Sequence, residues 1–303
     1  MRLVFAGTPE VAVASLEALV GSRHEVVGVV TRRDAPSGRG RRLTPSPVAE
    51  RAAELGIEVA KPASPKDSGF QDWLRSKDAD VCPVVAYGAL LPASALSIPR
   101  FGWVNLHFSV LPRWRGAAPV QRAIMAGDPV IGTTCFQIVA PLDAGAVYRV
   151  AQRPMPETPA GEVLALLARE GAAQLVETID AIEAGETPVP QPEEGVTYAH
   201  KITVDDARLD WSRPARELLW QVRGCSPDPG AWCLLDGLRL KVYDAEPGSG
   251  DQELAPGEVR IGRREVLVGT GEGNLELTEV QAPGKRRMPA IDWARGAQPG
   301  TLR

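Results

Sequence analysis

The sequence is poor in the residues that build metal centres and disulfide frameworks. It contains three histidines in 303 residues, and its four cysteines are widely spaced, with no CxxC pair. A multi-histidine metal site is therefore hard to assemble, and the cysteine spacing argues against both a zinc site and a disulfide-bonded scaffold. Widely spaced cysteines without a disulfide framework are typical of a reducing compartment.

Long apolar runs and a strong net charge are also missing. No run approaches the roughly 20 apolar residues of a membrane span, and the first residues resemble neither a signal peptide nor a transit peptide. The formal net charge is −4, with a pI near 5.6, so bulk charge does not indicate a nucleic-acid-binding protein. We expect a cytoplasmic protein without membrane contact, in which any contact to a polyanion comes from a local cluster.

The first thirty residues predict a β-α-β unit that lacks nucleotide-binding motifs. Residues 3–6 and 25–31 are apolar runs, and between them residues 11–19 show the apolar spacing of a helix that ends at Gly21. All-apolar strands are typical of a parallel sheet that is covered on both faces. Neither GxGxxG nor GxxxxGK[ST] follows these strands, which disfavours bound NAD and an ATP P-loop.

The remaining segments predict two domains. Further strands and helices are expected, in chain order, at residues 46–56, 79–86, 104–108, 117–127, 131–139, 147–150 and 162–183. This alternation favours a doubly wound, mostly parallel α/β sheet over residues 1–189. A proline-rich stretch then begins a linker, 190–206, and residues 207–303 carry short strands, one pair of which flanks an Asp236-Gly237 hairpin turn. Their spacing suggests a small barrel.

One strand carries polar residues of catalytic type. From Val104 to Ser109 apolar and polar residues alternate, so Asn105 and His107 are expected to project from the same face. An amide can donate to a developing oxyanion, and an imidazole can move a proton or carry positive charge. Two polar residues facing solvent on an edge strand would give the same pattern, so the pattern alone does not decide.

Asp143 and the arginine-rich residues 32–43 are two further candidate functional features. Asp143 lies in a turn at the end of an expected strand, where it is either part of the same site or an ordinary turn aspartate that caps local amides. Residues 32–43 form a long polar connection with five arginines around Ser and Gly. Such a loop can contact a phosphate backbone, or it can simply be solvated in a chain that is rich in arginine.

The run from Asn105 to Pro119, NLHFSVLPRWRGAAP, closely resembles the methionyl-tRNA formyltransferases. The resemblance extends over most of the chain and includes residues 5–9, 38–43, 45–47, 85–88 and 142–145. It implies a Rossmann-like catalytic domain, a linker and an OB-like β-barrel. It further implies transfer of a formyl group from 10-formyltetrahydrofolate to the α-amine of methionyl initiator tRNA by an enzyme that we expect to be a monomer without a metal.

The resemblance also implies roles for particular residues. Asn105, His107 and Asp143 match the catalytic positions, with Asp143 orienting the imidazole or a bridging water and favouring the imidazolium. The folate-contacting segment corresponds to Ser109, Val110, Leu111 and Pro112. The tRNA-contacting loop corresponds to Arg39, Arg41 and Arg42. The chain departs from the family pattern at Phe108, Val110, Ala144 and Ala146 and, in the second domain, in residues 225–230. The first four departures leave the shape of the folate pocket open.

Other functions share part of this pattern. A glycinamide-ribonucleotide or sugar-nucleotide formyltransferase would use the same chemistry but would need neither the arginine-rich loop nor a second domain. A folate-dependent hydrolase would use the same three residues, and an assay with the acceptor would separate it. A catalytically inactive nucleic-acid-binding module is disfavoured, because residues 206–303 carry 14 basic and 15 acidic residues.

Overall fold

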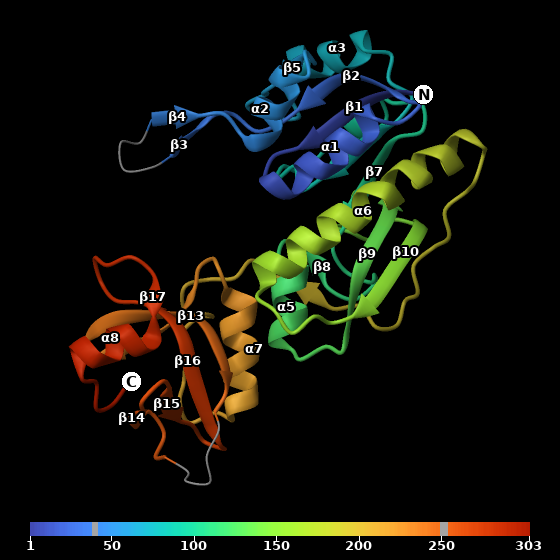
Figure 1. Cartoon of the computed structure of the whole chain (residues 1–303). Coiled ribbons are helices and arrows are strands. Elements are labelled where there is room, and N and C mark those ends of the chain that lie inside the picture. The colour runs from blue at the N-terminus through green and yellow to red at the C-terminus, as the bar shows by residue number, and fades with distance from the viewer. Residues whose placement is uncertain (38–41, 249–253) are drawn as a thin grey trace. The chain divides into compact units, whose positions relative to one another are not determined.

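The structure is a computed structural model that describes residues 1–37, 42–248 and 254–303 (Figure 1). The chain divides into two compact units. The N-terminal unit comprises Met1–Gly116, Ile131–Arg153 and Leu164–Tyr198, and the C-terminal unit comprises Ala117–Val130, Pro154–Val163 and Ala199–Arg303. Among the described helices, none is long and apolar enough to cross a membrane.

A seven-stranded sheet forms the centre of the N-terminal unit. In spatial order its strands are β10 (Val147–Pro154), β9 (Val130–Gln137), β7 (Trp103–His107), β6 (Cys82–Val85), β1 (Arg2–Gly7), β2 (Glu25–Val30) and β5 (Val59–Ala60). The pairs β1/β2, β1/β6, β2/β5 and β6/β7 are parallel, whereas β7 and β9 are antiparallel. Four consecutive residues of β1, from Leu3 to Ala6, are fully buried, as expected for a strand covered on both faces. The predicted mostly parallel sheet is confirmed.

The helices of this unit agree with the sequence-based prediction where the helical spacing of apolar residues continues over a long segment. They are the 3-10 helix η1 (Glu10–Ala12), α1 (Val13–Val20), α2 (Pro47–Glu54), α3 (Ser68–Ser76), α4 (Ala93–Leu96) and most of α6 (Ala160–Glu183). The helix expected from residue 46 is α2, and Ser46 caps it because its Oγ accepts from Ala49 N at 3.1 Å. Helices α3 and α4 were not predicted, since they are only nine and four residues long.

The connection that the sequence presents as an irregular loop contains two short strands. β3 (Ala35–Ser37) and β4 (Arg42–Thr44) pair in antiparallel fashion, with Pro36 opposite Leu43. In Figure 1 these two strands extend away from the parallel sheet. Arg39 and Arg41 lie outside the described residues, while the backbone of Arg42 belongs to β4.

Helix α6 approaches strand β7 closely at a glycine. A Cβ atom on Gly171 would come within 2.9 Å of the side chain of Leu106, so a larger residue would separate the helix from the strand. A buried hydrogen bond from Thr133 Oγ1 to Gln174 Oε1 connects the same helix to β9. The strand that carries Asn105 and His107 is therefore held firmly by the helix and its neighbours.

An antiparallel sheet forms the centre of the C-terminal unit. Its order is β12 (Ala231–Leu235), β13 (Leu238–Pro247), β16 (Asn274–Gln281), β15 (Val266–Gly269) and β14 (Val259–Ile261), and β17 (Met288–Pro289) pairs with β16. Asp236 and Gly237 both have positive φ angles, 51° and 78°, which confirms the predicted hairpin between β12 and β13. The helices of this unit are α5 (Pro119–Met125), α7 (Ala215–Cys225) and α8 (Ala290–Ala297).

The core of this unit lies between the sheet and two of these helices. Leu218 and Val222 of α7 and Trp293 of α8 are buried among residues of β13 and β16. The chain also contains two-residue strands, β8 (Arg115–Gly116) and β11 (Tyr198–Ala199). All four cysteines are buried and free, as the spacing indicated.

The N-cap of α3 offers a direct test of the local structure. Asp67 Oδ1 accepts from Gly69 N at 2.8 Å and from Phe70 N at 3.3 Å. We expect Asp67→Ala to lower the free energy of unfolding by about 1 kcal/mol, because two amides lose their acceptor. Asp72→Ala is the control, since Asp72 lies on the same helix with a side chain 73% exposed and pairs with Arg75. If urea denaturation shows equal losses of unfolding free energy in both variants, the role of Asp67 as the N-cap is contradicted.

Candidate active site

Strand β7 places Asn105 and His107 at its carboxyl end. Residues two apart on a strand project from the same face, so both side chains lie on one side of the sheet. His107 is opposite Thr134 of β9, and Asn105 lies between Val84 of β6 and Phe136 of β9. His107 is 5% exposed, whereas Asn105 is partly exposed. The alternation in the sequence therefore gives the expected strand, with one buried and one accessible polar residue.

The two nitrogens of His107 have different environments. Nε2 lies 2.8 Å from the carbonyl oxygen of Trp114. A carbonyl can only accept, so the proton of a neutral His107 is on Nε2 and is donated to Trp114. Nδ1 faces Asp143, whose Oδ2 is 3.9 Å away, and the imidazole and the Phe136 ring make a T-shaped contact. In the neutral form Nδ1 thus keeps a lone pair that can receive a proton.

Burial determines the resting charge of His107. It lowers the pKa of the imidazole below its ordinary value, although the Asp143 carboxylate and the hydrogen bond to Trp114 both raise it. The sequence-based expectation that Asp143 favours the imidazolium is right in direction, but burial has the larger effect. His107 is therefore neutral near pH 7, and a proton that it gains during a reaction is stabilised by the nearby carboxylate.

Asp143 lies in the turn after β9, with its backbone in the left-handed region at φ 49°. Its Oδ2 accepts from Gly116 N at 2.7 Å, an amide 27 residues away in the chain. The carboxylate is therefore held by a distant strand and is not simply a cap on its own turn. The structure brings Asp143 and His107 together, as the sequence analysis proposed for a shared site.

The Asn105 side chain is available to a ligand. Within the described part of the chain its amide makes no hydrogen bond, although it is on the same strand face as the buried imidazole. An amide carries two N–H donors, which in this position are left for a group that enters the site.

The segment after β7 is fixed by a threonine of β9. Thr134 Oγ1 donates to the carbonyl of Ser109 at 2.7 Å and accepts from Leu111 N at 3.2 Å. Ser109 and Leu111 are buried, and Ser109 Oγ donates to the carbonyl of Arg113 at 2.7 Å. Of the four residues expected to contact folate, Val110 and Pro112 are the ones with partly exposed surfaces. A ligand beside this segment would meet their side chains and the backbone.

Sequence reasoning missed the contribution of residues 190–198, which it assigned to a linker. These residues belong to the N-terminal unit, and Thr197 Oγ1 accepts from Trp114 N at 2.9 Å. A pocket of about 450 Å³ beside Asp143 is lined by Arg115, Ala144, Ala146 and Gln191, among others. The sequence holds no signal for this contact, because a run of prolines with polar residues is equally typical of a linker.

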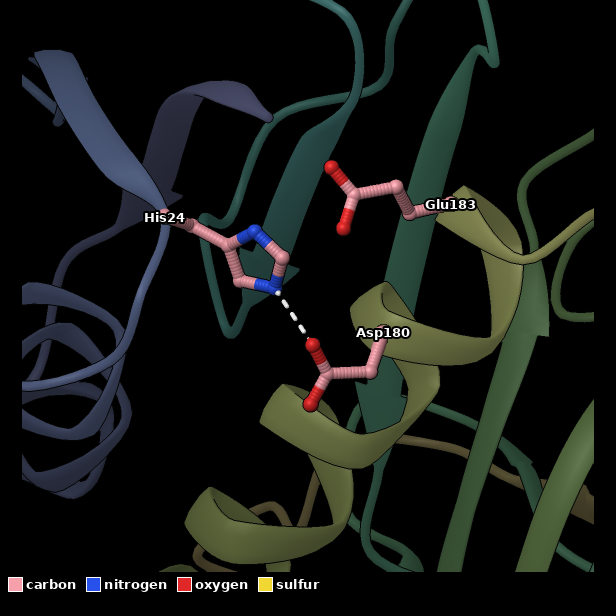
Figure 2. A group of neighbouring side chains, drawn as sticks. All are labelled: His24, Asp180 and Glu183. Carbon is pink, nitrogen blue, oxygen red and sulfur yellow. Dashed lines mark ion pairs between the residues drawn. The ribbon is translucent and has the colours of Figure 1, made fainter.

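A second group of polar side chains lies at the C-terminal end of α6 and has the residue types of a metal site. His24, Asp180 and Glu183 offer ligand atoms that all lie within 4.8 Å of one another (Figure 2). His24 Nε2 is 3.2 Å from Asp180 Oδ1, and its Nδ1 is 3.2 Å from the Met1 amine.

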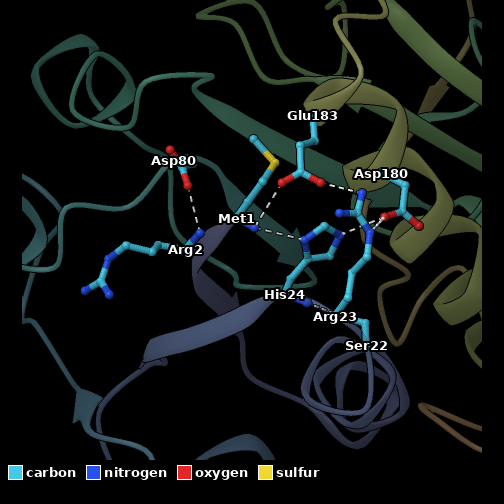
Figure 3. Close-up of polar contacts among 8 residues, drawn as sticks. All are labelled: Met1, Arg2, Ser22, Arg23, His24, Asp80, Asp180 and Glu183. Atoms are coloured by element: carbon cyan, nitrogen blue, oxygen red, sulfur yellow. Dashed lines mark hydrogen bonds and ion pairs between the residues drawn. The ribbon is translucent and has the colours of Figure 1, made fainter.

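Cations of the protein already occupy this group. Figure 3 shows the Arg23 side chain between the two carboxylates: its Nε donates to Asp180 Oδ1 at 2.6 Å, and its terminal nitrogen pairs with Glu183. The Met1 amine lies 3.4 Å from Glu183. A metal ion would have to displace Arg23, so we assign these residues to an ion-pair network that joins the start of β2 to the end of α6.

Comparison with known proteins gives a consistent result. The model of the family described as "Formyl transferase" matches residues 1–179, and that of "Formyl transferase, C-terminal domain" matches residues 201–298. A methionyl-tRNA formyltransferase of Streptomyces coelicolor is 58% identical over 98% of this chain and 97% of its own, and one of Nocardioides sp. is 57% identical over 98% and 96%. HypX from Aquifex aeolicus, solved in complex with tetrahydrofolic acid, superposes with a TM-score of 0.66 at 18% identity over 97% of this chain and 47% of its own.

The buried imidazole gives a pH-dependent prediction. We expect His107 to stay mostly neutral at pH 6.5, where about half of unperturbed imidazoles carry a proton, and to titrate at lower pH. Since the folded state disfavours the proton, the contribution of His107 to stability is complete above about pH 6.5 and declines as the pH falls below that value. An NMR titration of the three histidines measures this midpoint, with the His107 signal identified from its loss in His107→Asn. A midpoint at or above 6.5 would contradict the interpretation.

Proposed function

The chain belongs to the methionyl-tRNA formyltransferase family, and we propose that Asn105, His107 and Asp143 carry out its reaction. The enzyme transfers a formyl group from formyltetrahydrofolate to the α-amine of methionyl initiator tRNA, which prepares that tRNA for translation initiation. One observation supports the residue assignment most strongly. A neutral, buried imidazole faces a carboxylate through its unprotonated nitrogen, beside an amide whose donors make no bond to the described protein.

The proposed reaction is an acyl transfer through a tetrahedral intermediate. The neutral methionyl amine attacks the formyl carbon of 10-formyltetrahydrofolate, and the carbonyl oxygen becomes an oxyanion. The Asn105 amide donates to this oxygen. Because such a donor acts on charge that develops in the transition state, it lowers the barrier by about 3 kcal/mol in comparable sites.

His107 moves the proton in this scheme. Its Nδ1 accepts a proton from the attacking nitrogen, and the resulting imidazolium is stabilised by Asp143 and lies near the oxyanion. When the intermediate collapses, the bond between the formyl carbon and the folate nitrogen breaks, and the imidazolium returns the proton to that nitrogen. Trp114 holds the opposite side of the ring throughout, which keeps Nδ1 directed toward the reacting atoms.

The donor is a folate, and we propose that Ser109, Val110, Leu111 and Pro112 form part of its site. The support is their fixed position directly after β7, together with the similarity to a fold that binds tetrahydrofolic acid in HypX. The proposed reaction needs no metal, because the amide and the imidazole supply the charge stabilisation.

We further propose that the protein acts as a cytoplasmic monomer. Its catalytic domain would comprise residues 1–189, joined to an OB-like barrel at 207–303 by a linker, 190–206, whose first residues, up to Tyr198, pack with the N-terminal unit. The antiparallel sheet of the C-terminal unit and the family match at residues 201–298 support the second domain.

The arginine-rich connection is proposed to contact the tRNA. Arg42 belongs to β4, which together with β3 extends away from the parallel sheet (Figure 1). Arg39 and Arg41 belong to the same connection in the sequence, and all three would bind the phosphates of a large substrate. A small acceptor such as a ribonucleotide would not require this extension.

The first test concerns the reacting groups. We expect Asn105→Ala and His107→Ala each to lower kcat by about a hundredfold or more with little change in tRNA affinity, because both act in the transition state. Formylation of charged initiator tRNA with 10-formyltetrahydrofolate provides the assay. Ser94→Ala is the control, because it also removes a polar side chain, but one whose Oγ accepts a hydrogen bond from Gln71 and has no role in the proposed reaction. The mechanism fails if His107→Ala retains kcat near that of the wild type.

The second test concerns the arginines. Replacement of Arg39, Arg41 and Arg42 by alanine is expected to weaken tRNA binding and flatten its salt dependence, because each phosphate contact contributes a slope of about −0.7 to −0.9. Folate binding should stay unchanged.

Arg75→Ala combined with Arg100→Ala is the control, since both arginines are exposed elsewhere on the N-terminal unit. The affinity of each protein for tRNA, measured at several salt concentrations, decides whether the loop contacts the tRNA. Parallel slopes and equal affinities for the wild type and the triple variant would remove the loop from the tRNA site.

A further inference from the structure

We propose that Gln191 is a positioning residue that holds the Asp143 carboxylate against His107. This inference rests on the proposed function, in which Asp143 stabilises the protonated imidazole. Gln191 lies in the proline-rich run Pro190-Gln191-Pro192, to which the sequence analysis assigned a connecting role only.

The amide of Gln191 fixes the turn that carries Asp143. Its Nε2 donates to the carbonyl oxygens of Asp143 and Gly145, each at 2.8 Å. Asp143 has a backbone conformation that residues other than glycine seldom adopt, with φ at 49°. A turn of this kind persists only where its surroundings determine it. The two hydrogen bonds from one side chain supply that constraint on both sides of residue 144.

The same amide is anchored on the other side of the site. Gln191 Oε1 accepts from Arg115 Nε at 3.2 Å and from its terminal nitrogen at 2.7 Å. Arg115 lies between Trp114, whose carbonyl accepts from His107, and Gly116, whose N–H donates to the Asp143 carboxylate. A ring of contacts runs from the imidazole through Trp114 and Gly116 to Asp143 and back to the imidazole, and Gln191 supports it by joining Arg115 to the turn that carries Asp143.

Glutamine is suited to this position because it both donates and accepts. The two hydrogens of its NH₂ group serve one carbonyl each, and its oxygen serves the guanidinium. The partners also fix which way the amide points, since a reversed amide would place its oxygen against two carbonyl oxygens. A glutamate of the same length keeps the contact to Arg115 but loses both donors to the turn, and a methionine loses both kinds of contact.

Two replacements and a double variant test this role. Gln191→Met removes the bonds at nearly constant volume, and Gln191→Glu removes only the donors, which keeps the test possible if the methionine variant does not fold. Glu194→Met is the control, because Glu194 is exposed in the same segment. For each variant we would measure kcat and the KM of both substrates, alone and combined with Asp143→Asn.

We expect Asp143→Asn to lower kcat strongly, and Gln191→Met and Gln191→Glu to lower it by about tenfold or more, with both KM values within about twofold of the wild type. If Gln191 acts through the carboxylate, its replacement should lower kcat by less than about threefold in the Asp143→Asn background. Losses that multiply in the double variant, or a kcat within about twofold of wild type in the Gln191 variants, would overturn the inference.

The NMR titration of His107 separates the positioning role proposed for Gln191 from the catalytic role proposed for Asp143. A displaced carboxylate raises the pKa of His107 less, so the midpoint in Gln191→Met should move down toward that of Asp143→Asn, while that of Glu194→Met stays at the wild-type value. An unchanged midpoint in Gln191→Met would show that Gln191 does not hold Asp143. If this midpoint moves but Asp143→Asn keeps its kcat, the catalytic role proposed for Asp143 fails, and Gln191 holds a carboxylate that the reaction does not use.

Discussion

The hydrogen bond from His107 Nε2 to the carbonyl of Trp114 is the contact on which the candidate site depends. It assigns the proton of the neutral imidazole to one nitrogen and leaves the other facing Asp143. Without it, a buried imidazole could carry its proton on either nitrogen, and its charge state would be set by burial and the Asp143 carboxylate alone. The same carbonyl belongs to the segment between β7 and β8, so the orientation of the ring and the path of this segment are determined together.

Burial and charge act against each other at this imidazole. Burial keeps His107 neutral at rest, which is the form that can accept a proton from an attacking amine. The carboxylate at 3.9 Å is near enough to stabilise the proton once it has arrived, but it does not form a hydrogen bond to the ring in the resting state. A closer contact would favour a permanently charged imidazole, which could not act as a base.

The rigidity of the site comes from elements distant in the sequence. Thr134 of β9 binds two backbone groups of the segment that follows β7, and Gly171 allows α6 to approach the strand itself. The site therefore depends on packing around β7 as much as on the polar residues themselves. At the opposite end of α6, the pairing of Arg23 with Asp180 and Glu183 fastens the helix to the start of β2.

The sequence by itself determined features that depend on neighbouring residues. Alternation around Asn105 and His107 predicted their strand and shared face, and Asp236-Gly237 predicted a hairpin, because a strand period or a turn type is encoded within a few positions. Resemblance of a fifteen-residue run indicated the family. Only the tertiary structure decided that Gly116 and Gln191 hold Asp143, and that burial outweighs its charge at His107. Those outcomes depend on distances and desolvation among residues 27 to 48 positions apart, and no local pattern in the chain records them.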